Sequence, residues 1–360
     1  MTAIATNKLK RFFIEKLFDD IGDSNQRYYL GIGESQDWDS ADLAPTPIQS
    51  NVEERNARTK LQSIKNAEIF SFVVPRYNWI SGTTYEAYDD SLASQTNYYV
   101  FTDENKVFMC LQQGKSSFGT AVTSTVKPTG ESRQPLSTAD GYVWQYLYTI
   151  SALKATQFVS ANFIPVQKVI TPTDANETKQ KQIQDSAEVG QILGIKVTSP
   201  GTGYTGAPTV NITGRGQDSI GMTTGLITKT AAATATVSGG AVVKIEMNDS
   251  GSGKAFGRGY DFASVTLTGG GGTGAKATPI LTTNEDSGMG ADARKDLRSF
   301  GIMFNAKITG DENKKFIIGN DFRQVTLLKN PMIPKESSLP DSAVQVDAEI
   351  ALRSFGIMFN

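Results

Sequence analysis

The chain has 360 residues, a length that suits two or three domains with a sizeable hydrophobic core. Lys and Arg number 35 and Asp and Glu 37, so the formal net charge is −2. No whole-chain basic field therefore attracts nucleic acid or an anionic membrane. The sequence contains no histidine and a single cysteine, Cys110. These counts exclude His-dependent nucleophiles, His metal ligands and an internal disulfide.

Hydropathy gives no sign of a membrane segment. No run of about 18 apolar residues occurs, and residues 1–10 lack the apolar stretch of a signal peptide. We therefore expect a soluble protein made in a cytoplasm, with no membrane partner. The glycine count of 34 favours turns and short strands over long helices.

Helical patterns are confined to the first part of the chain. Apolar residues recur near the helical period over 8–21, which predicts an amphipathic helix followed by a strand over 28–33. The apolar positions Phe12, Phe13 and Phe18 exceed what one helix face usually buries. A stretch rich in Glu, Arg, Lys and Ala predicts a second helix over 52–67.

The following segment has the pattern of an antiparallel β domain. Short β-branched or aromatic runs, divided by polar turns, occur at 69–75, 98–101, 106–111, 143–150 and 163–170. The polar stretch 171–188 is typical of a linker. Apolar alternation returns at 300–308 and 322–331, and we expect these strands to resume the same domain after an insertion.

The insertion is built on a repeated plan. A strand, a Gly-x-Gly turn, a tyrosine and a strand ending in Thr-Gly occur over 195–214 and again over 245–269. The pair Gly239-Gly240 predicts a hairpin between them. We expect an N-terminal part over 1–189, an independently folded inserted domain over 190–283 and a return to the first domain over 284–360. The predicted fold class is mainly β with a few helices, a layered antiparallel β-sandwich core plus a small all-β inserted domain.

One segment occurs twice. The nine letters LRSFGIMFN stand at 297–305 and again at 352–360, an identity too long for chance. The second copy is either a duplicated strand or not a genuine part of the chain, and we favour the second interpretation because a chain that stops within a strand has no closing segment.

Reactive motifs lack the context that their chemistry needs. The G-x-G-x-x-G at 201–206 runs into another β segment instead of a helix, so a β-turn is favoured over a dinucleotide site. Cys110 lies in a β run and is expected in the core. Carboxylate pairs stand at 19–20, 37/39, 89–90 and 103–104, where solvated turn residues are the usual explanation. We predict no catalytic, cofactor-binding or metal-binding residues and no enzymatic activity.

An aromatic row stands out at 142–148. Tyr142, Trp144 and Tyr146 share one face of a predicted strand with Tyr148, and no Arg or Lys is interleaved for base stacking. The row suits either a core between sheets or a subunit interface.

Four segments, in order, resemble one known family. DGYVWQYL at 140–147 is similar to the G-D-G-Y-V-W-E-Y-L-F segment of the baseplate wedge proteins encoded by gene eight of T-even-like contractile-tailed phages. GIGESQDW at 31–38 resembles that family's F-G-R-S-E-P-W, VPRYNW at 74–79 its I-P-R-R-D-W, and FRQVTLLKNP at 322–331 its F-R-Q-I-S-I-I-T-N-P. The predicted inserted domain over 190–283, which we call the Gly-rich module, looks like β repeats of cyanophage structural proteins.

The resemblance implies a virion protein of the tail baseplate. Its expected role is that of a structural subunit, a homodimer that bridges neighbouring wedge proteins and binds no nucleic acid, cofactor or small-molecule substrate. An alternative function is a receptor- or carbohydrate-binding tail protein in which the Gly-rich module presents Tyr204 and Tyr260 to a sugar. The interface candidates are aromatic residues and one arginine: Phe12, Phe13, Phe18, Trp38, Arg76, Trp79, Tyr142, Trp144 and Tyr146.

Overall fold

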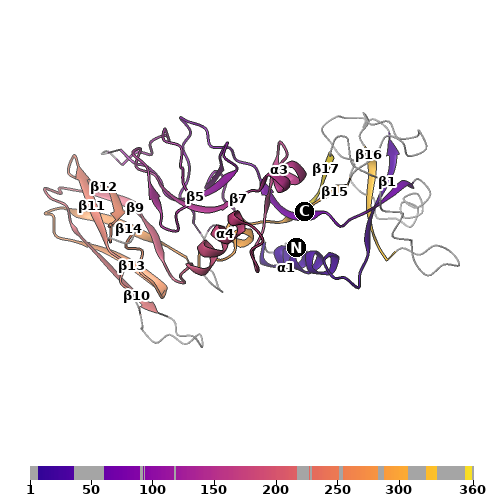
Figure 1. The fold of residues 1–360 in the computed structure, drawn as a ribbon. Helices are drawn as coiled ribbons and strands as arrows, with labels where there is room; N and C mark the ends of the chain where they lie inside the picture. Colours follow the sequence, from indigo (N-terminus) through magenta and orange to yellow (C-terminus); the bar gives the residue numbers. More distant parts are fainter. Residues whose placement is uncertain are drawn as a thin grey trace, which may run out of the picture. The chain divides into compact units, whose positions relative to one another are not determined.

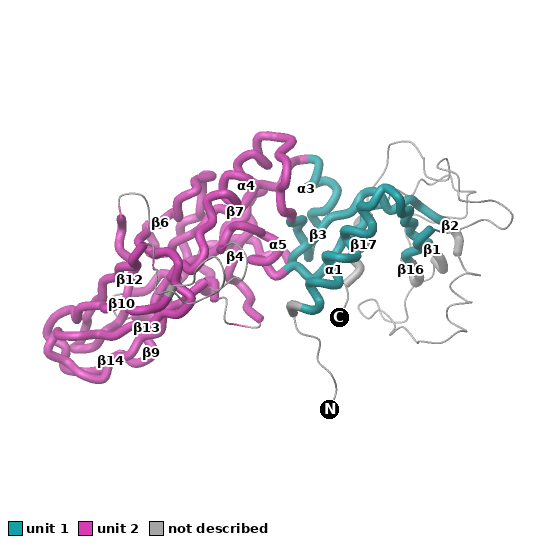
Figure 2. The backbone as a smooth tube through the Cα atoms, turned by 90° about the horizontal axis from the view of Figure 1, so that it is seen from below, with its two compact units in different colours: residues 1–74, 153–166, 299–360 teal, residues 75–152, 167–298 magenta. Residues whose placement is uncertain are grey.

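The chain folds into two compact units. The computed structural model describes residues 7–35, 61–89, 92, 94–116, 119–216, 227, 229–250, 254–282, 288–306, 322–330 and 353–358. Their fold is mainly β, with several antiparallel sheets and a few helices, which confirms the predicted class. Unit 1 comprises 1–74, 153–166 and 299–360, and unit 2 comprises 75–152 and 167–298 (Figure 2). These limits differ from the predicted domain boundaries, and the predicted inserted domain lies within unit 2.

The described part of unit 1 contains two sheets and two helices, and the helices are labelled in Figure 1. One sheet has the strand order β16-β1-β2 and the other β17-β15-β3-β8. The elements are α1 (Asn7–Ile21), β1 (Tyr28–Ser35), β2 (Leu61–Asn66), β3 (Phe70–Pro75), α3 (Ala152–Phe158), β8 (Phe163–Val166), β15 (Gly301–Ala306), β16 (Phe322–Lys329) and β17 (Arg353–Met358).

Helix α1, which the apolar period predicts, is held to the sheet by aromatic packing. The Phe18 ring stacks on Phe72 at 4.1 Å between centroids and meets Phe70 edge-on at 4.8 Å. Edge-to-face and stacked pairs of this kind add about 0.5–1.5 kcal/mol each beyond the area they bury. Phe18 therefore contributes to the packing of unit 1 itself.

The predicted helix over 52–67 is wrong for the part that the structure describes. Residues 61–66 form β2, which pairs antiparallel with β1 through Tyr29↔Asn66 and Gly31↔Ile64. Helix propensity is a weak preference, and the pairing offered by β1 outweighs it here. Residues 52–60 lie outside the described residues.

The second copy of the repeated nonapeptide takes part in a sheet. Its residues 353–358 form β17, which pairs antiparallel with β15 from the first copy. Ile302 lies opposite Ile357, its own counterpart in the repeat, so the two identical segments pair about a local twofold axis. The duplicated-strand interpretation describes what these residues form.

Unit 2 begins with a sheet of order β4-β5-β7-β6 and continues into the Gly-rich module. Its strands and helices are β4 (Tyr99–Phe101), β5 (Lys106–Gln112), β6 (Leu136–Ser137), β7 (Val143–Thr149), α4 (Ala175–Asp185), β9 (Ile192–Thr202), β10 (Thr209–Gly216), β11 (Ala233–Ser238), β12 (Ala241–Met247), β13 (Tyr260–Thr268), β14 (Thr273–Leu281) and α5 (Ala293–Asp296). The strands predicted over 98–101, 106–111 and 143–150 are confirmed, and a turn at 103–105 joins the first two.

The aromatic row of β7 forms the core of this sheet. Trp144 is fully buried, stacks on Tyr142 at 5.5 Å and meets Tyr85 edge-on at 5.4 Å. The phenol oxygen of Tyr142 donates to the carbonyl of Val122 at 2.7 Å, so its polar end is satisfied inside the unit. Of the two expectations for this row, a core or an interface, the structure places these rings in the core.

Helix α4 occupies the segment predicted to be a linker, and that prediction is wrong. The Asp174 carboxylate caps the helix by accepting from the backbone N–H of Glu177 at 2.8 Å. The buried face carries one apolar side chain, Ile183, between two amides. Gln180 donates to Gln167 O at 2.7 Å, and Gln184 bonds both backbone groups of Val169. Apolar periodicity therefore misses this helix.

The two repeat copies pair with each other. β10 of the first copy runs antiparallel to β13 of the second, and β9 pairs with β14. The hairpin at Gly239-Gly240 is confirmed, with φ values of 58° and 77° that favour glycine.

The tyrosines of the repeats are buried in slots lined by glycine. Gly272 lies so close to the Tyr204 ring that an added Cβ would stand 2.4 Å from it. A Cβ added to Gly214 would stand 2.8 Å from the Tyr260 ring. Both rings are less than 9% exposed. The expectation that this module presents Tyr204 and Tyr260 to a sugar is therefore wrong, because glycines without side chains let the rings pack inside.

Independent folding of the module stays a prediction. Replacing 190–283 by a short Gly/Ser linker tests it through the thermal melt of the remaining chain. A cooperative melt is the expected result, because closing a longer or shorter loop changes the entropy only slowly. Aggregation or a non-cooperative melt would show that the sheet of unit 2 needs the module.

Candidate functional site

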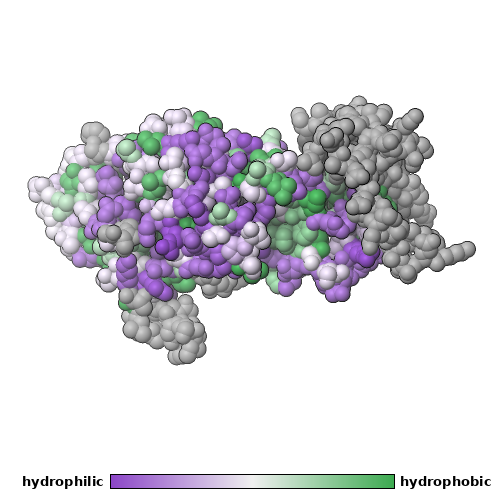
Figure 3. All heavy atoms as spheres, viewed as in Figure 1, coloured by the Kyte–Doolittle hydropathy of each residue, from purple (hydrophilic) through white to green (hydrophobic). Residues whose placement is uncertain are grey.

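The interface candidates occupy three kinds of position. On α1, Phe12 and Phe13 are 52% and 61% exposed, and apolar atoms gather around this helix in Figure 3. Phe18, Arg76 and Trp79 are half-buried, and Trp38 lies outside the described residues. The last group, Tyr142, Trp144 and Tyr146, is buried within unit 2 and cannot meet a partner without unfolding it.

Arg76 and Trp79 are engaged inside unit 2. The Arg76 guanidinium lies over the Phe101 ring at 5.2 Å, and its Nε donates to Asn78 Oδ1 at 2.8 Å. The Trp79 ring packs against the aromatic core. Both residues thus hold the 75–79 segment to the sheet.

Two of the family-like segments meet at one serine. Trp79 Nε1 donates to Ser124 Oγ at 3.1 Å, and Ser124 Oγ donates to Asp140 Oδ2 at 3.1 Å. Asp140 also accepts the backbone N–H groups of Thr125 and Val126 at 2.8 and 2.9 Å. Burial raises the pKa of Asp140, but a hydrogen bond from the Thr138 hydroxyl, together with those from Val126, Thr125 and Ser124, outweighs burial and holds the pKa below its usual range. The carboxylate therefore stays ionised and ties the two segments together.

The other two family-like segments pair in unit 1. β16 lies antiparallel to β1, with Gly31 opposite Thr326 and Ile32 opposite Val325. Beyond the strand, Asn330 Oδ1 accepts the backbone N–H of Arg27 at 2.8 Å and closes the end of the pairing. Segments almost 300 residues apart therefore form one ladder.

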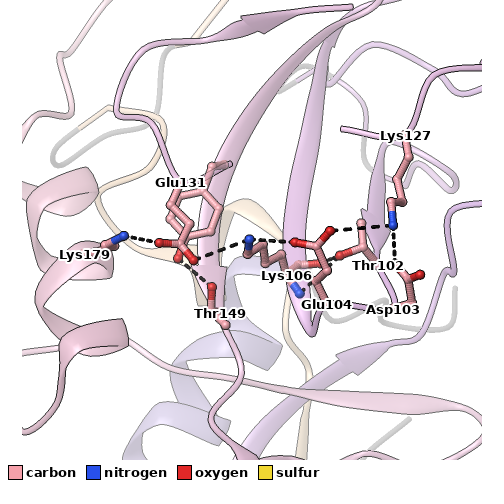
Figure 4. Close-up of polar contacts among 9 residues, drawn as sticks. Thr102, Asp103, Glu104, Lys106, Lys127, Glu131, Thr149 and Lys179 are labelled. Atoms are coloured by element: carbon pink, nitrogen blue, oxygen red, sulfur yellow. Dashed lines mark hydrogen bonds and ion pairs between the residues drawn. The ribbon is translucent and has the colours of Figure 1, made fainter. Parts of the chain in front are cut away.

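A line of alternating charges crosses one face of unit 2 (Figure 4). Lys106 Nζ lies 2.7 Å from Glu104 Oε2 and 3.5 Å from Glu131 Oε1. Glu131 also pairs with Lys179 of α4, and Lys127 pairs with Glu104 and with Asp103 at 2.7 Å. We call these six side chains the charge row; they join α4 and the 127–131 loop to the β4–β5 turn.

The charge row suits cohesion better than acid catalysis. Hydrogen bonds from Lys127, Lys106 and Lys179 lower the pKa values of Asp103, Glu104 and Glu131, respectively. A general acid in glycoside hydrolysis needs a carboxyl with a raised pKa. Among the other predicted pairs, Asp20 is held ionised by Lys329 and by the Tyr28 hydroxyl. Asp37, Asp39 and Asp90 lie outside the described residues.

Replacement of Lys106, the central lysine of the charge row, tests how much the row contributes to stability. Lys106→Met is expected to lower the free energy of unfolding by about 1 kcal/mol at pH 7, since the row is partly exposed. Because the pKa values of Glu104 and Glu131 are lowered in the folded chain, their contribution is complete above about pH 4.3, the pKa of a free Glu, and is lost as pH falls through the folded values. Urea unfolding at pH 7 and pH 3 measures the difference.

Lys276→Met is the matched control, because Lys276 is exposed on β14 and makes no ion pair among the described residues. A Lys106→Met effect that is equal at both pH values would contradict the electrostatic account.

Other sequence candidates carry no reactive geometry. Cys110 is fully buried, and burial raises the pKa of its thiol far above the usual range. Gly201 in β9 and Gly203 just after it have φ of 65° and 77°, and the segment continues into the strand β10 and not into a helix, as the sequence predicts. Within the described ranges, no cluster of three or more Cys, Asp or Glu side chains could hold a metal ion.

The search for a membrane-spanning helix and the comparison with known proteins identify no function. None of the helices in the described part of the chain is long and apolar enough to span a membrane. No protein-family model matches this sequence, and no curated protein matches it.

Proposed function

We propose that this chain is a structural subunit of a phage contractile-tail baseplate wedge, which holds neighbouring wedge proteins and catalyses no reaction. In this role it is made in the host cytoplasm and is carried in the virion. It acts as a homodimer and contacts other wedge proteins, without nucleic acid, cofactor or membrane.

The pairing of the family-like segments carries the proposal. Segments 74–79 and 140–147 meet through Trp79, Ser124 and Asp140, while 31–38 and 322–331 supply the paired strands β1 and β16. The four matched segments contact one another in two pairs. Such contacts are expected if the chain shares the fold of that family. The likeness rests on fold-forming residues, which suits a scaffold protein.

Localisation in the virion tests this proposal. Antibodies raised against the purified chain are applied to intact and contracted virions of the encoding phage, and bound antibody is located by gold-label electron microscopy. Label at the tail end farthest from the capsid, together with the chain in isolated baseplates by mass spectrometry, is the expected result. Label on the capsid, or a chain found in infected cells and absent from virions, would refute the assignment.

Dimerisation is expected to depend on the exposed rings of α1. Burying two phenylalanine side chains contributes about 3–6 kcal/mol, enough to decide whether protomers associate at micromolar concentration. The double variant Phe12→Ser/Phe13→Ser should therefore be a monomer near 38.8 kDa by light scattering, while the unchanged chain has twice that mass.

Leu153→Ser is the control, since Leu153 is 67% exposed on α3 of the same unit. It should leave the dimer intact. A mass of 38.8 kDa for the unchanged chain at micromolar concentration would contradict the predicted dimer.

A further inference from the structure

A cavity of about 380 Å³ lies inside unit 2, where the parent sheet meets the Gly-rich module. The end of β5 forms one wall, β9 and β12 form the other, and Glu86, Ala87, Asp89, Leu92 and Gln95 border them. β9 approaches so closely that a Cβ on Gly194 would stand 3.7 Å from the carbonyl oxygen of Leu111. The module and the parent sheet therefore form this cavity together.

The floor of the cavity is apolar and its rim is charged. Leu111, Ile195 and Ile245 line it and are buried. The rim carries both signs of charge: Lys115, Lys196, Lys244, Glu86, Asp89 and Glu246. A concave surface that combines apolar side chains with a few converging polar groups is typical of small-molecule sites, and 380 Å³ lies within their size range.

Much of the rim is already occupied by internal contacts. Lys244 pairs with Glu246 at 2.9 Å, and Gln112 donates to the same carboxylate at 3.4 Å. Gln113 donates to the carbonyl of Tyr85 at 2.9 Å. These contacts fix the groups in place, and the Gln112–Glu246 contact joins the parent sheet to the module.

Two lysines on the rim are different. Within the described part of the chain, the ammonium groups of Lys115 and Lys196 make no ion pair or hydrogen bond, although both side chains line the cavity. Burial and then the nearby charge of Lys196 hold the pKa of Lys115 below its usual range. An anion between the two ammonium groups would remove this repulsion and would gain two charge-assisted hydrogen bonds.

We propose that this cavity binds a small organic anion, whose acidic group is held between Lys115 and Lys196. The ligand class is an acidic monosaccharide unit: the carboxylates of Glu86 and Glu246 accept from hydroxyl groups, and the apolar floor takes the ring face. This inference does not depend on the role in a baseplate.

Calorimetric titration of the full chain tests the proposal with three probes. Galacturonate carries the anionic group, galactose is its neutral match, and inorganic phosphate distinguishes a phosphorylated ligand from a carboxylated one. Galacturonate is expected to bind at least about tenfold more tightly than galactose, which corresponds to loss of one charge-assisted contact. Phosphate binding that depends on the same lysines would keep the anion site and assign a phosphorylated ligand.

Matched lysine variants locate the binding. Lys115→Gln and Lys196→Gln should each weaken anion binding about tenfold, while Lys276→Gln, on an exposed position of β14, should change it less than twofold. No binding of any probe, equal binding of galacturonate and galactose, or binding unchanged in both cavity variants would overturn the proposal.

A second measurement serves if Lys115→Gln does not fold. A lysine with a lowered pKa reacts faster with amine reagents than an ordinary surface lysine, so limited acylation of the unchanged chain is followed by peptide mass spectrometry. Galacturonate or phosphate should protect Lys115 and Lys196 and leave Lys276 unprotected. Equal labelling with and without both anions would contradict the proposed site.

Discussion

Replacement of Trp144 by alanine is expected to lower the free energy of unfolding of unit 2 by about 3–5 kcal/mol, the usual cost of removing a buried large aromatic side chain. The ring is fully buried, stacked on Tyr142 and in contact with Tyr85, so the surrounding side chains cannot close the space. Urea unfolding followed by the fluorescence of Trp79, which packs on the same core, measures the loss.

Trp144→Phe separates packing from hydrogen bonding. The indole Nε1 of Trp144 has no hydrogen-bond partner among the described residues, so phenylalanine removes no bond and keeps most of the ring contact. A loss of about 1–2 kcal/mol is expected. A phenylalanine variant as unstable as the alanine variant would show that the indole makes a polar contact that the packing account omits.

The glycine slots of the repeat module should be as sensitive as the aromatic core. In Gly272→Ala the added Cβ would stand 2.4 Å from the Tyr204 ring and 2.6 Å from its backbone nitrogen. Side-chain rotation cannot move a backbone atom, so the turn between β13 and β14 must move away from the β9–β10 connection that carries Tyr204, at a cost of about 3 kcal/mol. Hydrogen exchange of the β9–β14 amides should show this loss directly.

Gly206 provides the matched control in the same module. A Cβ there meets no atom within 4 Å, and the φ angle of Gly206 is not positive. Gly206→Ala should therefore change the protection by less than about 0.5 kcal/mol. Equal loss in both variants would indicate that the module tolerates no side chain at any glycine, and that the tyrosine slot is not the cause.

Strands could be predicted where β-branched and aromatic residues form short continuous runs. A helix could not be predicted where its buried face is mainly polar. β3, β4, β5 and β7 consist of β-branched and aromatic runs whose two faces are both filled. α4 buries amides that bond to the backbone of 167–169, so it has no apolar stripe. Its one readable signal was the Asp174 and Glu177 pair at the spacing of a capping box.

The cavity could not be predicted from the sequence, for a different reason. Lys115 follows β5, Lys196 lies in β9 and Lys244 in β12, so only the packing of three strands brings them to one rim. Each lysine is unremarkable in its own segment, because surface lysines are common. The exposed rings of Phe12 and Phe13 were predictable, since a helix with apolar residues on more than one face cannot bury them all.

The pairing of β15 with β17 gives the chain a competitor for one of its own strands. β3 lies against β15 through Gly301↔Val73 and Ile302↔Phe72, and the same letters stand at 356 and 357. An unfolded chain that closes β3 onto the second copy spans about 55 residues more, a difference of only about 0.2 kcal/mol in loop entropy. Two strand orders with nearly equal loop-closure entropy can thus compete during folding, a local case of frustration. What separates them is the chain on either side of each copy, because their nine residues are the same.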